Sequence, residues 1–168
     1  YELDLEELNL SKIARLSTHM MEGRAVDAGI KLSVSIDKED EVIVADRRAV
    51  MQILLNLLSN AIKFTGKNGS VSLYIEDCGQ DVLLKVVDTG IGIPAHKIAN
   101  ITMPFEQVEN EYSRQHEGSG LGLAITKDLA ELHNGSLTIE SEVGKGTTVC
   151  IKMPKNPATD YISAQQSA

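Results

Sequence analysis

The segment from Asp46 to Thr65 constrains the fold more than any other part of the sequence. Its apolar residues recur at three- and four-residue spacing, which predicts a long helix with one broad apolar stripe. Asp46 is placed to cap the start of this helix, and Gly66 with the Asn68-Gly69 pair is expected to end it. A stripe this wide must be buried, and a chain of 168 residues is long enough to bury it. The stripe consists of Val50, Ile53, Leu54, Leu57, Leu58, Ala61 and Ile62.

Around this helix the sequence predicts two further helices and several short strands. The first helix is indicated by the spacing of Ile13, Leu16, Met20 and Val26. The short turns between the later strands imply antiparallel pairing. We therefore expect an α/β two-layer sandwich, with a mixed, largely antiparallel sheet and helices packed on one face. The further helices are expected over residues 9–28 and 121–133, and the strands over 1–8, 30–36, 41–45, 70–76, 82–87, 136–140 and 147–153.

The chain is expected to contain one domain and a tail. Residues 1–154 are predicted to form the domain. Residues from about 95 to 119 are interpreted as a lid, because a long loop inside a compact domain is usually functional or disordered. Residues 155–168 are polar and are predicted to be a disordered tail or linker. Because the chain starts at Tyr1 rather than Met, it is expected to be cut from a longer protein.

Charge and cysteine content exclude several classes of partner. The formal net charge is −8 and the sequence pI is near 5.0, which argues against binding of nucleic acid or direct membrane contact. No apolar run approaches the roughly 20 residues of a membrane helix, although the parent protein can still be membrane-anchored. Cys78 and Cys150 lack metal-ligand spacing and are expected to be reduced thiols of a cytoplasmic protein.

The polar face of the long helix carries an unusual set of side chains. Gln52, Asn56, Asn60 and Lys63 fall within an arc of about 80° opposite the apolar stripe. A face that is merely solvated favours better helix formers than asparagine. An amide carbonyl oxygen suits Mg²⁺, so two asparagines one turn apart point to a metal or phosphate site. On this motif alone, a solvated face stays open as the alternative.

Two glycine-rich patches are candidate ligand sites. Asp88–Pro94 follows a predicted strand, and its glycines permit either close approach to a ligand or a tight strand-to-helix turn. Gly118–Ala124 opens a predicted helix, where backbone N–H groups can hold phosphate. The alternative for this second patch is a flexible hinge. Its glycine spacing fits neither a Rossmann nor a P-loop motif. A smaller patch, Gly144–Thr148, is most simply a hairpin turn.

Taken together, these segments resemble the ATP-binding domain of sensor histidine kinases, in the GHKL superfamily. That family has a Bergerat-type ATP-binding fold. Residues 52–65 are similar to its N box, 88–93 to its first glycine box, 104–107 to its F box, 118–123 to its second glycine box and 146–148 to its last box. All five follow the family's order. Gln107 departs from the pattern, since many relatives have Arg there, and Ile101-Thr-Met-Pro stands where Ile-Phe-Glu-Pro is commoner.

The resemblance implies that the chain binds ATP and Mg²⁺. Asn60 would coordinate the metal with Asn56 in support, and Asn56, Lys63 and Arg114 would position the phosphates for transfer. Asp88 would accept a hydrogen bond from the adenine amino group, with a water shared with Thr147. The other residues implied are Phe64 and Ile93 beside the base, Gly90 and Gly92 in the first glycine box, and Gly118, Ser119, Gly120, Leu121, Gly122 and Leu123 around the phosphates.

The implied function is transfer of the γ-phosphate to a histidine on a separate dimerisation domain, in two-component signalling. A response regulator receiver domain would then be the partner of the full-length kinase. The isolated chain is expected to be a monomer and its parent a homodimer. No acceptor context surrounds any of the four histidines, so this chain is not expected to phosphorylate itself; they are His19, His96, His116 and His133.

Two alternative functions stay open. One is a nucleotide-binding pseudokinase that acts as an allosteric module. The other, less favoured, is a GHKL ATPase that hydrolyses ATP. Asn56 stands where the water-activating branches have a glutamate, and an amide cannot act as a general base at neutral pH.

Overall fold

The computed structural model of the chain describes residues 1–103 and 122–157. A five-stranded sheet has the order β2–β4–β5–β7–β6, and a separate ribbon pairs β1 with β3. β2 and β4 are parallel, whereas the other three neighbouring pairs of the sheet are antiparallel. The bounds are β1 Leu5–Asn9, β2 Lys31–Ile36, β3 Val42–Asp46, β4 Ser70–Cys78, β5 Asp81–Asp88, β6 Ser136–Glu142 and β7 Gly146–Pro154.

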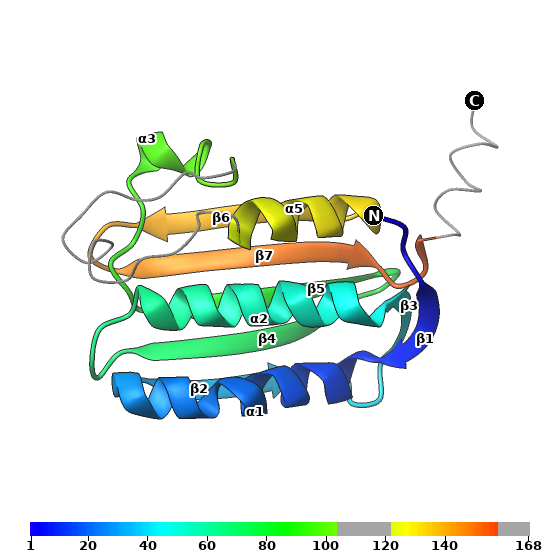
Figure 1. Cartoon of the computed structure of the whole chain (residues 1–168), viewed down its shortest axis with the longest axis horizontal. Coiled ribbons are helices and arrows are strands. Elements are labelled where there is room, and N and C mark those ends of the chain that lie inside the picture. The colour runs from blue at the N-terminus through cyan, green and yellow to red at the C-terminus, as the bar shows by residue number, and fades with distance from the viewer. Residues whose placement is uncertain (104–121, 158–168) are drawn as a thin grey trace.

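The helices α1, α2 and α5 lie side by side over one face of the sheet (Figure 1). They span Leu10–Ala28, Arg47–Lys63 and Gly122–Leu132, and a short helix α3, Ala95–Ile98, follows β5. The Asp46 side chain accepts a hydrogen bond from the Ala49 N–H, so the predicted cap of α2 is confirmed. The expected α/β sandwich with a mixed sheet is confirmed as well. No helix in the described residues is both long and apolar enough to cross a membrane.

The apolar stripe of α2 forms the centre of the core, because all seven of its predicted residues are buried. The face predicted for α1 is wrong in part. Leu16, Met20 and Val26 are 50%, 54% and 76% exposed, and Ile13 alone of the four is buried. Small residues instead let α1 approach its neighbours, and buried hydroxyls are tolerated because Ser17 and Thr18 donate to carbonyls one turn back. The buried face of α1 is Leu10, Ser11, Ile13, Ala14, Ser17, Thr18, Met21 and Ala25.

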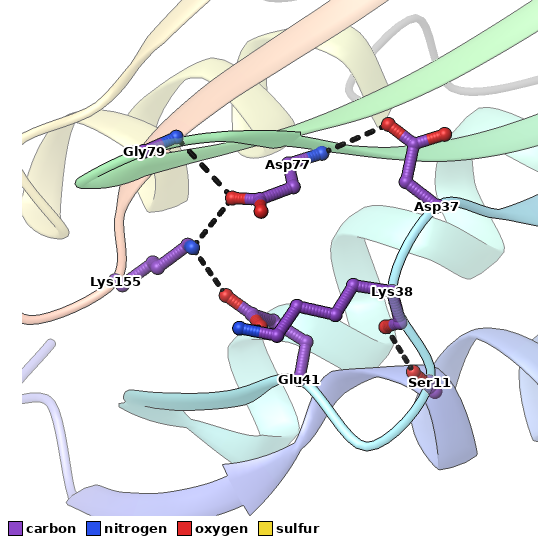
Figure 2. Close-up of polar contacts among 7 residues, drawn as sticks. All are labelled: Ser11, Asp37, Lys38, Glu41, Asp77, Gly79 and Lys155. Atoms are coloured by element: carbon purple, nitrogen blue, oxygen red, sulfur yellow. Dashed lines mark hydrogen bonds and ion pairs between the residues drawn. The ribbon is translucent and has the colours of Figure 1, made fainter.

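The chain after β7 is held at the end of the sandwich away from α3 (Figure 1). The Lys155 ammonium lies between the carboxylates of Glu41 and Asp77, at 2.5 and 2.6 Å (Figure 2). Lys38 contacts the second oxygen of Glu41 at 3.2 Å. The Lys155 N–H donates to Gln80 and its carbonyl accepts from β3. Residues 155–157 of the expected tail are thus placed against the domain, and residues 158–168 lie outside the described ranges.

Replacing Lys155 with Met is expected to lower the free energy of unfolding by about 2–3 kcal/mol. The reason is that Glu41 is buried and, among the described residues, would keep only Lys38 as a charged partner. Hydrogen bonding to Lys155 lowers the pKa of Glu41. The stabilisation is therefore present above the ordinary pKa of a glutamate and is lost as the pH falls through the lowered value. Urea unfolding at several pH values measures both effects.

The control for this substitution is Lys152→Met. The Lys152 ammonium lies 3.7 Å from Asp81 and its side chain is 57% exposed, so its removal is expected to cost less than about 1 kcal/mol. Equal losses for the two variants would contradict the importance of the buried Glu41.

Candidate functional site

Asp88, the last residue of β5, lies at the centre of the candidate site. Its Oδ1 accepts hydrogen bonds from the Gly90 N–H at 2.8 Å and the Thr147 N–H at 3.2 Å. These bonds fix the carboxylate, while its Oδ2 has no hydrogen bond to any described residue. Burial raises the pKa of Asp88, and the two backbone hydrogen bonds oppose that shift in part. Asp88 therefore presents one acceptor oxygen to a ligand.

The C-terminal half of α2 brings three of the predicted residues to the same end of the fold. The Asn56 Nδ2 lies 3.5 Å from the carbonyl oxygen of Gly122, at the start of α5. The Asn60 side chain is half-buried and has no hydrogen bond to a described residue. The Lys63 ammonium lies 5.4 Å from the centroid of the Phe64 ring. Within residues 1–103 and 122–157 no carboxylate pairs with Lys63, and burial lowers the pKa of its ammonium.

The first turn of α5 lies beside Asn56. The Gly122 carbonyl also accepts a hydrogen bond from Thr126 Oγ1 at 2.8 Å, and Leu123 is buried. Apart from its chain neighbours and its own helix, a Cβ at Gly122 would meet no atom of the described residues within 4 Å. The other residues predicted for the phosphates, and the F box, lie outside the described residues: Arg114, Gly118, Ser119, Gly120, Leu121 and Pro104–Gln107.

The glycines after Asp88 are required by the protein's own backbone. A Cβ on Gly90 would lie 2.3 Å from the Phe64 carbonyl oxygen, and one on Gly92 would lie 2.2 Å from the carbonyl oxygen of Glu142. Gly92 also has a φ of +74°, which disfavours side chains. The Ile91 N–H donates to the Phe64 carbonyl at 3.1 Å. This segment is therefore a turn that packs tightly between the end of α2 and β6. The turn places Phe64 close to Asp88.

Ser141 is a residue of the site that the sequence did not single out. Its Oγ lies 2.7 Å from the Ile93 nitrogen, 3.0 Å from the Gly146 carbonyl oxygen and 2.7 Å from Thr147 Oγ1. It thereby joins the turn after Asp88 to the β6–β7 hairpin. In the sequence, the one indication of Ser141 was its position in a hairpin with Thr147. Identifying Ser141 required the strand register, which pairs it with Thr147.

Comparison with known proteins identifies the family. Residues 45–157 match the model described as histidine kinase-, DNA gyrase B-, and HSP90-like ATPase. The chain belongs to this family. A curated relative, an uncharacterized sensor-like histidine kinase of Rhizobium meliloti (strain 1021), is 40% identical over 93% of this chain and 30% of its own length. The chain spans less than a third of the length of the first three curated relatives it matches.

Solved histidine kinases have the same fold. The catalytic domain of histidine kinase ThkA matches with a TM-score of 0.81 and 29% identity, over 93% of this chain and 99% of that chain. ThkA in complex with the response regulator protein TrrA matches at 0.77 and 28%, over 92% and 42%. Full-length ShkA in complex with AMPPNP matches at 0.81 and 32%, over 92% and 32%. The chain is therefore a histidine kinase catalytic domain, as its resemblance implied, and this family of ATPase domains binds ATP.

Proposed function

We propose that this domain binds ATP with Mg²⁺ and passes the γ-phosphate to a histidine on a separate dimerisation domain. One observation carries most weight: a carboxylate oxygen, an amide and an ammonium at one end of the fold have no hydrogen-bonding or ion-pair partner among the described residues. They belong to Asp88, Asn60 and Lys63. A purine amine, a metal ion and a phosphate are respectively the partners that these groups would satisfy.

These groups fit a nucleotide laid from β5 towards α5. Asp88 would bind the adenine amino group with Thr147 beside it, and Phe64 and Ile93 would line the base. Lys63, with Arg114 from outside the described residues, would hold the phosphates together with the amides of residues 118–123. Asn60 would ligate Mg²⁺, which would supply positive charge at the phosphates. Gly90 and Gly92 would shape the pocket by holding the turn after Asp88 in place.

The residues of the domain contribute binding and orientation to phosphoryl transfer. A nitrogen of the acceptor imidazole would bond to the γ-phosphorus while the bond to the β–γ bridging oxygen breaks, which leaves ADP. The Asn56 Nδ2 lies 3.5 Å from the Gly122 carbonyl oxygen, between α2 and the start of α5. It cannot take a proton from water, which suits transfer to a histidine better than hydrolysis.

The acceptor histidine is proposed to come from another domain. His133 is fully buried between the Leu129 carbonyl and the Asp46 N–H, at 2.7 and 3.1 Å. His19 is exposed on α1 beside Glu22, and His116 lies outside the described residues. We propose that the isolated domain is a monomer and the parent a homodimer, in the cytoplasm or anchored to its membrane. A response regulator receiver domain would accept the phosphate next.

Asn60→Ala is expected to remove the Mg²⁺ dependence of ATP binding while leaving the fold intact, because the side chain lies outside the apolar stripe. Thermal unfolding of the unmutated chain with ATP and Mg²⁺ at a hundred times the dissociation constant should show about 2.7 kcal/mol of stabilisation. Omitting Mg²⁺ should reduce this for the unmutated chain and change little for the variant. Arg48→Ala, at an exposed position in the first turn of α2, should behave as the unmutated chain.

Further outcomes separate the alternative functions. An unshifted melting curve for the unmutated chain would refute nucleotide binding. Binding without phosphotransfer by the full-length parent would favour the pseudokinase. Fast steady-state phosphate release by this chain would favour the ATPase.

A further inference from the structure

Ser141 uses its full hydrogen-bonding capacity at the edge of the site. A serine hydroxyl has one proton to donate and two positions to accept. Its three neighbours are the Ile93 N–H, the Gly146 carbonyl and the Thr147 hydroxyl, all within 3.0 Å. The first of these can only donate and the second can only accept, whereas the Thr147 hydroxyl can do either.

Counting protons assigns the direction of each bond. If all three contacts are hydrogen bonds at once, Ser141 donates to Gly146 and accepts from Ile93 and from the Thr147 hydroxyl. The reverse arrangement, in which Ser141 donates to Thr147, leaves Gly146 without this donor and has one hydrogen bond fewer. The arrangement with three bonds turns the Thr147 proton towards Ser141. The lone pairs of Thr147 Oγ1 are then the only groups that its hydroxyl offers to a ligand.

We propose that Ser141 is a positioning residue that makes Thr147 a hydrogen-bond acceptor and so selects a purine with an amino group at position 6 over one with a carbonyl group there. This inference rests on the proposed binding of ATP. Thr147 pairs with Asp88 across β5 and β7, and its N–H donates to the Asp88 carboxylate. The Asp88 Oδ2, which has no hydrogen bond to a described residue, and the Thr147 Oγ1 are thus two neighbouring acceptors. An amino group, with two N–H donors, complements them directly, whereas a carbonyl oxygen in the same place would face lone pairs.

The role of Ser141 is tested by comparing ATP with inosine triphosphate. The two differ in the group at position 6 and in the N1 proton that accompanies the carbonyl. In Ser141→Ala the Thr147 proton loses its acceptor, so the hydroxyl can rotate and donate to a carbonyl. Titration calorimetry with Mg²⁺ gives the dissociation constant of inosine triphosphate divided by that of ATP. This ratio is expected to fall about tenfold from its value in the unmutated chain, which corresponds to the free energy of one hydrogen bond.

Two further variants test whether the effect depends on the hydroxyl. Ser141→Thr keeps the oxygen and should restore the ratio. Ser136→Ala, on the exposed start of the same strand, should leave it unchanged. Thr147→Val should lower the ratio as Ser141→Ala does, and combining the two should lower it no further, because both act through one hydroxyl.

Each outcome has a distinct meaning. If the unmutated chain binds neither nucleotide, the proposed function itself fails. If it prefers ATP and folded Ser141→Ala weakens both nucleotides equally, Ser141 supports the local structure only and the inference is overturned. If Ser141→Ala does not fold, the comparison of Ser141→Thr with Thr147→Val decides. Equal ratios in those two variants would overturn the inference.

Discussion

Asp88→Asn is expected to weaken ATP binding by about 10- to 150-fold, the value of a hydrogen bond to a charged group. Asparagine has the same shape, so its Oδ1 can still accept from Gly90 and Thr147. Its amide nitrogen would replace the free carboxylate oxygen and present N–H donors to the donors of the adenine amino group. Titration calorimetry with ATP and Mg²⁺ measures the loss.

The same substitution is expected to leave the free domain at least as stable at neutral pH. Burial raises the pKa of Asp88 above its ordinary value of 3.8. The folded chain therefore binds the carboxyl proton of Asp88 more tightly than the unfolded chain does. The contribution of Asp88 to stability therefore falls as the pH rises from 3.8 through the raised value. Asparagine removes this pH dependence, which urea unfolding at acidic and neutral pH would show.

The control is Asp81→Asn at the opposite end of β5, which should not alter ATP binding. Loss of more than about 2 kcal/mol of stability in Asp88→Asn would show that the carboxylate charge supports the fold and would contradict this account.

The sequence predicted α2, its cap and its buried face well because the information is local. The apolar stripe repeats within one segment, and Asp46 caps the helix three residues before its bonding partner, Ala49. The same helix carries Asn56, Asn60 and Lys63. Because the helical period of this segment was predicted correctly, all three were assigned to one polar face. The contact of Asn56 with Gly122 required no more than the packing of two predicted helices.

Prediction failed where burial depends on neighbours distant in the chain. In α1 the apolar Leu16 and Met20 are exposed, whereas Ser17 and Thr18 are buried. The hydrophobicity of these side chains would favour burial of the leucine and methionine and exposure of the two hydroxyls. Burial of the two hydroxyls is possible because each bonds a carbonyl of its own helix.

Contacts between segments distant in the sequence account for the other differences. The need for glycine at position 90 comes from the Phe64 carbonyl, and the contacts of Ser141 come from the pairing of β6 with β7. Both depend on three-dimensional neighbours that the local pattern does not encode. A glycine-rich patch therefore predicted a tight backbone without showing whether a ligand or the protein itself fills the space.

The charged groups of the site differ from structural ion pairs, because burial disfavours their charged forms. Lys155 is held by two carboxylates, and its pKa is raised by them. Lys63 has no carboxylate partner in the described part of the chain, and burial lowers its pKa. The protein therefore disfavours the charged form of Lys63 in the absence of ligand, as it does for Asp88. A phosphate would reverse that effect on Lys63.

Lys63→Met is accordingly expected to weaken ATP binding by about 10- to 100-fold, through loss of one charged contact to phosphate, and to leave adenosine binding unchanged. Stability of the free domain should stay within about 1 kcal/mol, because relief of the buried charge offsets the lost interaction with the C-terminus of α2. Calorimetry with ATP and with adenosine separates the phosphate from the base. Lys127→Met, on α5, where the side chain is 45% exposed, is the control. Equal weakening of ATP and adenosine would place Lys63 at the base rather than at the phosphates, and unchanged ATP binding would remove it from the site.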